Sequence, residues 1–212
     1  MIDLPASTVV SRFLPKEKFY SKTTMSSKLR QHFTDEIDKI TWSNKIAPET
    51  LNITAGEYAE LQVFEIIIKE SEISTAVLRH IDTFILYPIL FIVRKNGSQK
   101  AVISYKQQGT RNEDSMKVDS YFDTGWVKDL KLDLKGRSVD EIYKNFLLQI
   151  APHLSVNRHA STKEVVEQNK AKQSLQNRVD ALNKQIRGEV SLAKKQELAR
   201  QRYALEQERD SL

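Results

Sequence analysis

Residues 58–106 read YAELQVFEIIIKESEISTAVLRHIDTFILYPILFIVRKNGSQKAVISYK, and they hold the densest cluster of apolar side chains in the chain. Their first part, from Leu61 to Ile68, is rich in β-branched and aromatic residues, which is typical of a strand buried on both faces. A helix is predicted next, because apolar residues recur at helical spacing and a serine can cap its start. The stripe consists of Ile73, Val77, Ile81 and Phe84, and the candidate caps are Ser71 and Ser74.

The last part of this stretch predicts a β-hairpin. Pro88 ends the helical region, and two apolar runs, 89–93 and 101–105, flank the dipeptide Asn96-Gly97. Asn-Gly readily supplies the two positive φ angles of a tight hairpin turn. The order strand, helix, hairpin is a β-α-β-β unit, so we expect an α+β fold with a mostly antiparallel sheet built on it.

Composition sets the outer limits of the interpretation. The chain has 212 residues, 40% of them hydrophobic, and a mean hydropathy of −0.50. No apolar run approaches the roughly 20 residues that span a bilayer, and the N-terminus lacks a signal-like stretch, so we expect a cytoplasmic protein without membrane contact. The absence of cysteine excludes disulfides and thiolate chemistry. The net charge of +5 permits a nucleic-acid partner without requiring one.

Further elements are predicted on both sides of the central unit. A short helix is expected from Ser26 or Ser27 to Phe33, and residues 116–126 have strand-like composition. A capping box at Ser138 predicts a helix that Pro152 closes. The remaining expectations are a strand carrying Ile40, Trp42 and Ile46, a loop at 47–53 with Leu51 and Ile53 under the sheet, and a strand or extended edge carrying Leu130, Leu132 and Leu134.

The C-terminal segment is expected to form a helical arm. A second capping box begins at Ser161, and the chain beyond it has no proline and a single glycine, Gly188. We therefore divide the chain into an α+β domain, 1–160, and a coiled-coil or helical-hairpin arm, 161–212. Gly188 is a plausible turn, but one continuous helix remains open. The apolar seam of the arm consists of Val165, Leu175, Val179, Leu182, Ile186, Leu198 and Leu205.

This seam is the main functional feature that the sequence offers. A polar helix with a narrow apolar stripe gains little stability alone, so it needs another helix to cover it. The seam therefore predicts self-association or association with a partner protein.

The segment 12–30 is strongly basic and contains aromatic residues. It carries six cationic side chains and one acid, which gives a net charge of +5. Cations can pair with phosphates while aromatic rings stack on unpaired bases, so one interpretation is a DNA or RNA contact. The other is that the aromatic residues anchor an N-terminal arm and the cations are solvated. The candidate nucleic-acid-binding residues are Arg12, Lys16, Lys18, Lys22, Lys28 and Arg30.

No catalytic motif stands out. The four histidines lack metal-ligand spacing, and neither a Gly-rich phosphate loop nor a Gly-x-Ser-x-Gly elbow is present. We expect no cofactor and assign no metal site. The alternative function is a divergent Mg-dependent nuclease, since restriction-type enzymes place Glu-x-Lys on a strand of such a unit. The corresponding Ser104-Tyr105-Lys106 lacks the acid, and nothing in the sequence brings Glu65, Lys69, Asp119 and Asp123 together.

Several short phrases occur in an order that resembles the bacterial family of domain of unknown function 4391 along nearly the whole chain. Where that family usually has Thr-Glu-Trp, this chain has Gly125 in the middle position. The phrases are Leu14-Pro15-Lys16, Ile40-Thr41-Trp42, Pro48-Glu49-Thr50-Leu51-Asn52, Tyr87-Pro88-Ile89-Leu90-Phe91, Ile103-Ser104-Tyr105-Lys106, Thr124-Gly125-Trp126 and the charged tail.

The resemblance implies a setting and no catalytic residues. Members of the family look like companions of DNA methyltransferases and helicases in restriction-modification or phage-defence gene clusters. Together with the helical arm, this predicts a non-catalytic accessory subunit that associates with itself, a methyltransferase or a helicase. Nucleic-acid contact through 12–30 is the further hypothesis.

Overall fold

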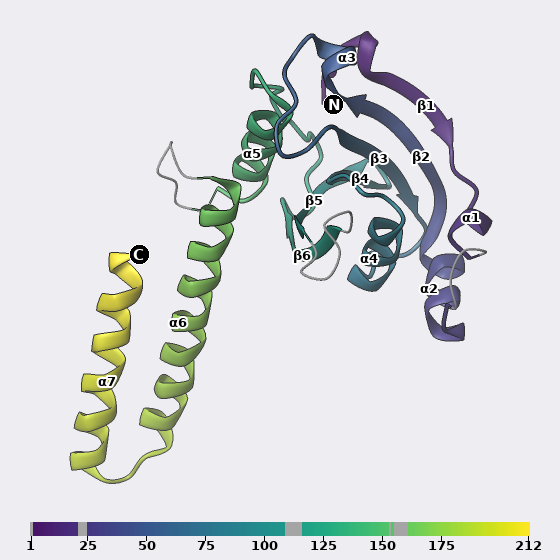
Figure 1. Ribbon diagram of the computed structural model, residues 1–212. Coiled ribbons are helices and arrows are strands. Elements are labelled where there is room, and N and C mark those ends of the chain that lie inside the picture. The colour runs from purple at the N-terminus through teal and green to yellow at the C-terminus, as the bar shows by residue number, and fades with distance from the viewer. Residues whose placement is uncertain (1, 21–24, 109–115, 153, 155–160) are drawn as a thin grey trace. The chain divides into compact units, whose positions relative to one another are not determined.

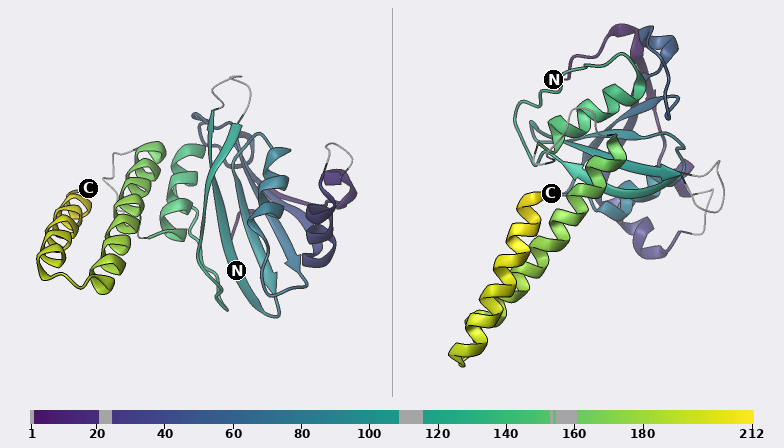
Figure 2. Two further views of the ribbon diagram at one scale, coloured as in Figure 1. Left: turned by 90° about the horizontal axis from the view of Figure 1, so that it is seen from below. Right: turned by 60° about the vertical axis from the view of Figure 1, so that its left-hand side comes forward.

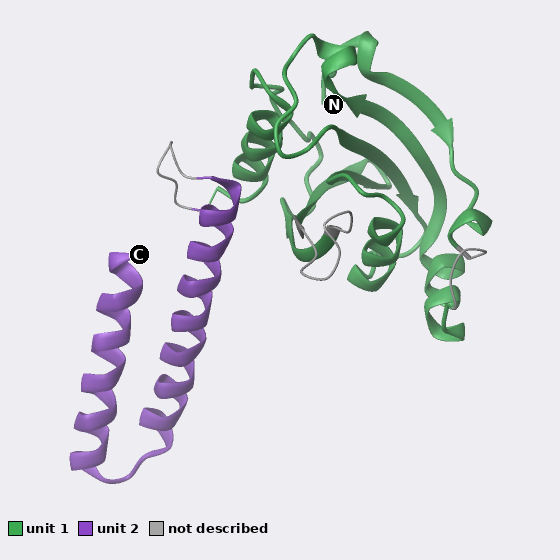
Figure 3. Ribbon diagram, in the orientation of Figure 1, with its two compact units in different colours: residues 1–152 green, residues 153–212 purple. Residues whose placement is uncertain are grey.

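The computed structural model describes residues 2–20, 25–108, 116–152, 154 and 161–212. The chain divides into two compact units, residues 1–152 and 153–212 (Figure 3). The sequence analysis predicted a domain boundary after residue 160. The residues just before it, 155–160, lie outside the described part of the chain. Each unit is considered separately below.

The first unit is built on one six-stranded sheet (Figure 1). The strands follow one another in sequence order, and only β3 and β4 pair in parallel, with Phe64 opposite Phe91. All other neighbours are antiparallel. The strands are β1 (Val9–Phe13), β2 (Ile37–Ile46), β3 (Leu61–Ile68), β4 (Ile89–Lys95), β5 (Ser98–Gln108) and β6 (Met116–Asp123).

Helices cover both faces of this sheet. In Figure 2, α4 and α5 lie on opposite sides of the strands. The crossover between the parallel strands runs through α4, and α2 packs beside it, while α5 contacts β5 and β6 from the other side. The helices are η1 (Ala6–Thr8), α1 (Glu17–Tyr20), α2 (Ser27–Glu36), α3 (Pro48–Leu51), α4 (Thr75–Thr83) and α5 (Val139–Ile150).

The central strands are buried on both faces, as the apolar sequence predicts. Phe91 and Val93 belong to the core cluster on the α4 side. Leu90 and Ile92, which are also buried, alternate with them and therefore point to the opposite face. That second face is closed by buried residues of α5, including Phe146. The other members of the α4-side cluster include Phe19, Phe33, Ile40, Phe64, Ile66, Val77, Ile81 and Val102.

The predicted β-α-β-β unit is confirmed. It corresponds to β3, α4, β4 and β5, and the turn between the last two strands has positive φ at Asn96 (47°) and Gly97 (79°). Beyond this unit, α2 continues past Phe33 to Glu36, and the loop at 47–53 contains the short helix α3. Residues 130–134 form no strand, although Leu130 and Leu132 are buried in alternation with exposed charges.

The second unit contains the helices α6 (Thr162–Gly188) and α7 (Leu192–Ser211), which pack against each other as a hairpin. The α6 helix begins with the predicted capping box and ends at Gly188, so the chain turns there. Polar side chains bridge the helices: Arg202 donates to Asn183 (3.3 Å) and Arg209 to Gln176 (2.6 Å). Among the described residues, no helix has the length and apolar character to cross a membrane.

Candidate functional site

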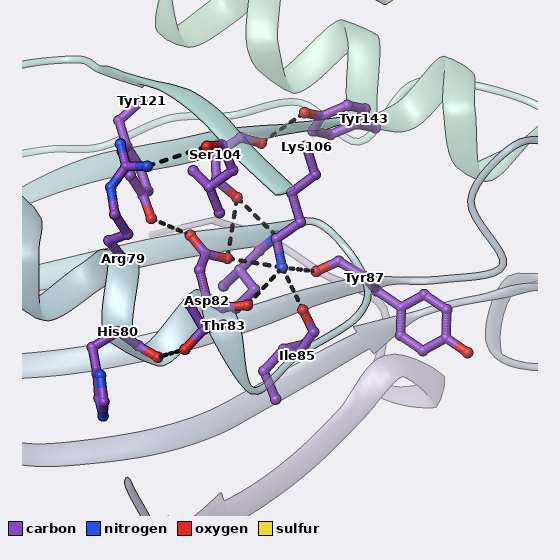
Figure 4. Close-up of polar contacts among 12 residues, drawn as sticks. Arg79, His80, Asp82, Thr83, Ile85, Tyr87, Ser104, Lys106, Tyr121 and Tyr143 are labelled. Atoms are coloured by element: carbon purple, nitrogen blue, oxygen red, sulfur yellow. Dashed lines mark hydrogen bonds and ion pairs between the residues drawn. The ribbon is translucent and has the colours of Figure 1, made fainter. Parts of the chain in front are cut away.

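The most unusual charged group of the first unit is Lys106. The sequence analysis compared this residue with the lysine of a nuclease motif whose acid is missing here. Its side chain is 0% exposed and lies between β5 and the connection from α4 to β4 (Figure 4). The ammonium group donates to the backbone carbonyls of Asp82 (3.1 Å), Ile85 (2.5 Å) and Tyr87 (2.7 Å). It also pairs with the Asp82 carboxylate at 3.0 Å. Lys106 therefore fixes the path of the chain as it leaves α4.

Asp82 is the counterion, and it is also 0% exposed. Its carboxylate accepts hydrogen bonds from the hydroxyls of Ser104 (3.3 Å) and Tyr121 (2.5 Å). Burial raises the pKa of Asp82 against the opposing pull of Lys106, and burial lowers the pKa of Lys106. The pair thus sits in an environment that penalises both charges, and its stability depends on the completeness of its hydrogen bonds.

Two tyrosines tie this network to the other face of the sheet. Tyr143 of α5 donates to the Ser104 carbonyl (2.6 Å), and Tyr58 donates to the Lys106 carbonyl (2.9 Å). Their rings meet edge to face with centroids 5.2 Å apart. Burial raises the pKa of both tyrosines, so they remain neutral donors. The network is a structural connection across the sheet.

The residues named for the nuclease alternative are not brought together. Glu65 pairs with Arg94 (2.9 Å), and Asp119 accepts from the neighbouring Ser120 (2.6 Å). Asp123 accepts from the backbone N–H of Gly125 (2.8 Å). Across the described ranges, no group of three or more metal-ligating side chains is found.

A cavity of about 370 Å³ opens on the α4 side of the sheet, beside the connection that Lys106 holds. Volumes of roughly 300–1,000 Å³ are typical of ligand pockets. One wall is the segment 84–87, and the floor includes Gln62 and Phe64 of β3. Trp42 of β2 stands opposite Phe64 in the strand register. Aromatic rings thus line this cavity from two strands and the segment after α4.

The basic segment contributes directly to the cavity. Arg12 and Lys18 line it, and both are exposed. Lys16 instead donates to the Ile37 carbonyl (2.7 Å), and burial lowers its pKa. Lys28 and Arg30 are exposed on α2, away from the cavity lining. Lys22 lies outside the described residues.

The aromatic residues of this segment behave differently from one another. Phe19 is 5% exposed and belongs to the core, as the anchoring interpretation predicts, whereas Phe13 is 56% exposed. Anchoring by Phe19 leaves the neighbouring Lys18 at the cavity rim. The two interpretations of the segment, an anchored arm and a cationic contact surface, are therefore compatible.

The predicted seam of the arm lies in the α6–α7 hairpin. Leu175 and Val179 are buried, at 4% and 2% exposure. No residue of α7 is buried, and Leu192 and Tyr203 of that helix are 71% and 62% exposed. Val165 is also buried, and the other seam residues, Leu182, Ile186, Leu198 and Leu205, are half-buried. A groove of about 490 Å³ between the helices is lined by Arg178, Ala181, Leu182, Gln201, Ala204 and Leu205.

The comparison with protein families gives one result. The model of the family described as domain of unknown function (DUF4391) matches residues 2–208. The chain belongs to this family. Neither the curated proteins nor the solved structures gave a match.

Proposed function

We propose that this DUF4391 protein is a non-catalytic accessory subunit that assembles with other proteins through its α6–α7 hairpin. The observation that carries the proposal is α7, a helix of 20 residues without a buried side chain. Most helices in proteins are stabilised by packing an apolar face. In α7 the apolar residues are half-covered or exposed, so a further helix would complete their burial.

The groove between α6 and α7 supports this proposal. Its lining combines the half-buried Leu182 and Leu205 with the small exposed residues Ala181 and Ala204. Small side chains let another helix approach closely, and the two leucines offer apolar area to it. Two such hairpins placed face to face would form a four-helix bundle, which is a common way to close a two-helix layer. A second copy of the chain is therefore the first partner to test.

The cellular setting of the proposal comes from the family. Members of the DUF4391 family resemble proteins that accompany DNA methyltransferases and helicases in gene clusters. We therefore propose that this protein acts in a bacterial restriction-modification-like or phage-defence system. In that setting the hairpin would hold either a second copy or a methyltransferase or helicase subunit.

Deleting residues 162–212 is expected to abolish association while the α+β unit stays folded. The full-length protein should show a mass that rises with concentration in sedimentation velocity, or should retain a methyltransferase or helicase subunit when co-expressed with one. The truncated chain should do neither. Its fold is checked by the cooperativity of its thermal transition.

A full-length variant tests the same point without truncation. Replacing Ala181 and Ala204 with arginine fills the groove and should also prevent association. The matched control is Ala193→Arg, which makes the same change at an exposed position of α7 outside the groove. The proposal fails if the wild-type protein is monomeric and retains neither subunit, or if the groove variants assemble as the control does.

A further inference from the structure

The cavity beside the α4–β4 connection has the features of a binding site for a planar ring. Trp42, Phe64, Phe84 and Tyr87 all line it. Phe64 is 2% exposed, while the other three rings are half-buried and therefore have surface to offer. Stacking on such rings is the usual way that proteins hold an unpaired base.

Gln62 supplies a polar group inside this apolar lining. The residue is 5% exposed, and its Oε1 atom has no hydrogen-bond partner within the described part of the chain. A buried acceptor without a partner is unfavourable, which is why such atoms in native proteins call for an explanation. This oxygen is covered in the unliganded chain, but Gln62 lines the cavity, so a rotation of its amide toward the cavity would let a ligand N–H donor satisfy it. Glutamine pairs well with adenine, because its amide matches the amine and ring nitrogen of that base.

Charge at the rim of the cavity favours an anionic group. Arg12 and Lys18 are exposed there, on β1 and α1. The one carboxylate of the lining, Glu60, pairs with Lys45 at 2.7 Å. The rim therefore carries two cations that could contact a phosphate, next to a floor that could hold a base.

We infer that this cavity binds a nucleotide whose base carries an exocyclic amine, with the base between Trp42 and the segment 84–87 and its amine on Gln62 Oε1. Arg12 and Lys18 contact the phosphate. The nucleotide is either free or the unpaired residue of a single strand, since both present the same base and phosphate. The cavity belongs to the first unit and the hairpin to the second, so this inference is independent of the assembly role.

The experiment measures binding to the full-length protein by calorimetry. The probes are adenosine monophosphate, adenosine, purine riboside monophosphate, which lacks the amine, and a short single-stranded oligodeoxyadenylate. Adenosine monophosphate or the oligonucleotide should bind. The probe that binds more tightly shows whether the cavity takes a free nucleotide or an unpaired residue of a single strand. Loss of the amine or of the phosphate should weaken binding about tenfold each.

Variants assign the contacts. Gln62→Leu should weaken the binding of adenosine monophosphate about tenfold and leave the binding of purine riboside monophosphate unchanged. It should not lower the melting temperature, because it removes an unsatisfied buried group. Trp42→Leu should weaken every probe about tenfold or more. Arg12→Gln and Lys18→Gln should each weaken the binding of the phosphorylated probes and reduce the dependence of that binding on salt concentration.

The matched control is Lys28→Gln, which removes a charge from the same basic segment outside the cavity lining. It should leave binding of every probe unchanged. The inference is overturned if no probe binds at millimolar concentration. It is also overturned if Gln62→Leu and Arg12→Gln bind like the wild-type protein, or if Lys28→Gln weakens binding as much as Arg12→Gln. Both decisive variants keep the aromatic lining, so the result does not depend on the folding of Trp42→Leu.

Discussion

Replacing Lys106 with methionine is expected to lower the free energy of unfolding by about 3–5 kcal/mol, the cost typical of removing one partner from a buried ion pair. Methionine fills a similar volume but donates no hydrogen bond. Asp82 would keep its carboxylate at 0% exposure without a counterion. The carbonyls of Ile85 and Tyr87 would lose the ammonium donor as well. The effect should therefore exceed that of an ordinary surface lysine many times over.

Chemical denaturation of the purified protein measures this difference. The matched control is Lys131→Met, in which a lysine that is 79% exposed and lies 3.2 Å from Asp129 undergoes the same change. Exposed pairs contribute little, so the control should unfold like the wild type. A loss below about 1 kcal/mol for Lys106→Met would show that the pair does not hold the connection after α4.

The stability deficit of Lys106→Met should shrink as the pH falls. Burial already raises the pKa of Asp82, and loss of the cation removes the main influence that opposes this rise. A carboxyl group with a folded-state pKa above its unfolded value takes up a proton first in the folded protein, so stability increases as the pH falls through the folded pKa. Denaturation at about pH 8 and about pH 5 should show a smaller difference from the wild type at the lower value. A deficit that stays constant or grows would contradict a charged, unpaired Asp82.

The elements that local pattern can specify were predicted well. The run Leu61–Ile68 and the Asn96-Gly97 turn each carry their signal within a few residues, so the β-α-β-β unit could be read directly. The sequence offered Gly188 as a turn but left one continuous helix open, and the structure ends α6 at Gly188. The strand or extended edge at 130–134 did not become a strand, because alternation reports which side chains are buried and not whether the backbone finds a pairing edge.

The functional geometry depended on contacts that no local pattern contains. Asp82 and Lys106 lie 24 residues apart on a helix and a strand, and a lysine at a strand end carries no sign that it points inward. The cavity likewise requires β1, β2 and β3 to pair in register before Arg12, Trp42 and Gln62 come together. The one available hint was Gln62 itself, which with Glu65 is one of two polar residues in the strand Leu61–Ile68.

Replacing Val179 with aspartate is expected to open the α6–α7 hairpin, at a cost of at least about 3 kcal/mol, because a carboxylate would be placed in a buried seam. Val179 is 2% exposed and lies on α6 between the two bridging residues Gln176 and Asn183. No residue of α7 is buried even in the intact hairpin, so its 20 helical residues depend on packing against α6, which the broken seam would remove. Far-UV circular dichroism should then show a loss of helix, and association should be lost with it.

The matched control for Val179→Asp is Asn177→Asp, which adds the same charge two residues earlier at an exposed position and keeps the acceptor for Gln173. This control should retain the helical signal and the association of the wild type. If Val179→Asp loses helix but still assembles, the hairpin is not the assembly surface, because its exposed apolar face exists only when both helices are formed. If it keeps its helix, α7 is stabilised by something other than the seam. The helix content and the mass of the same variant therefore separate the hairpin's stability from its proposed role.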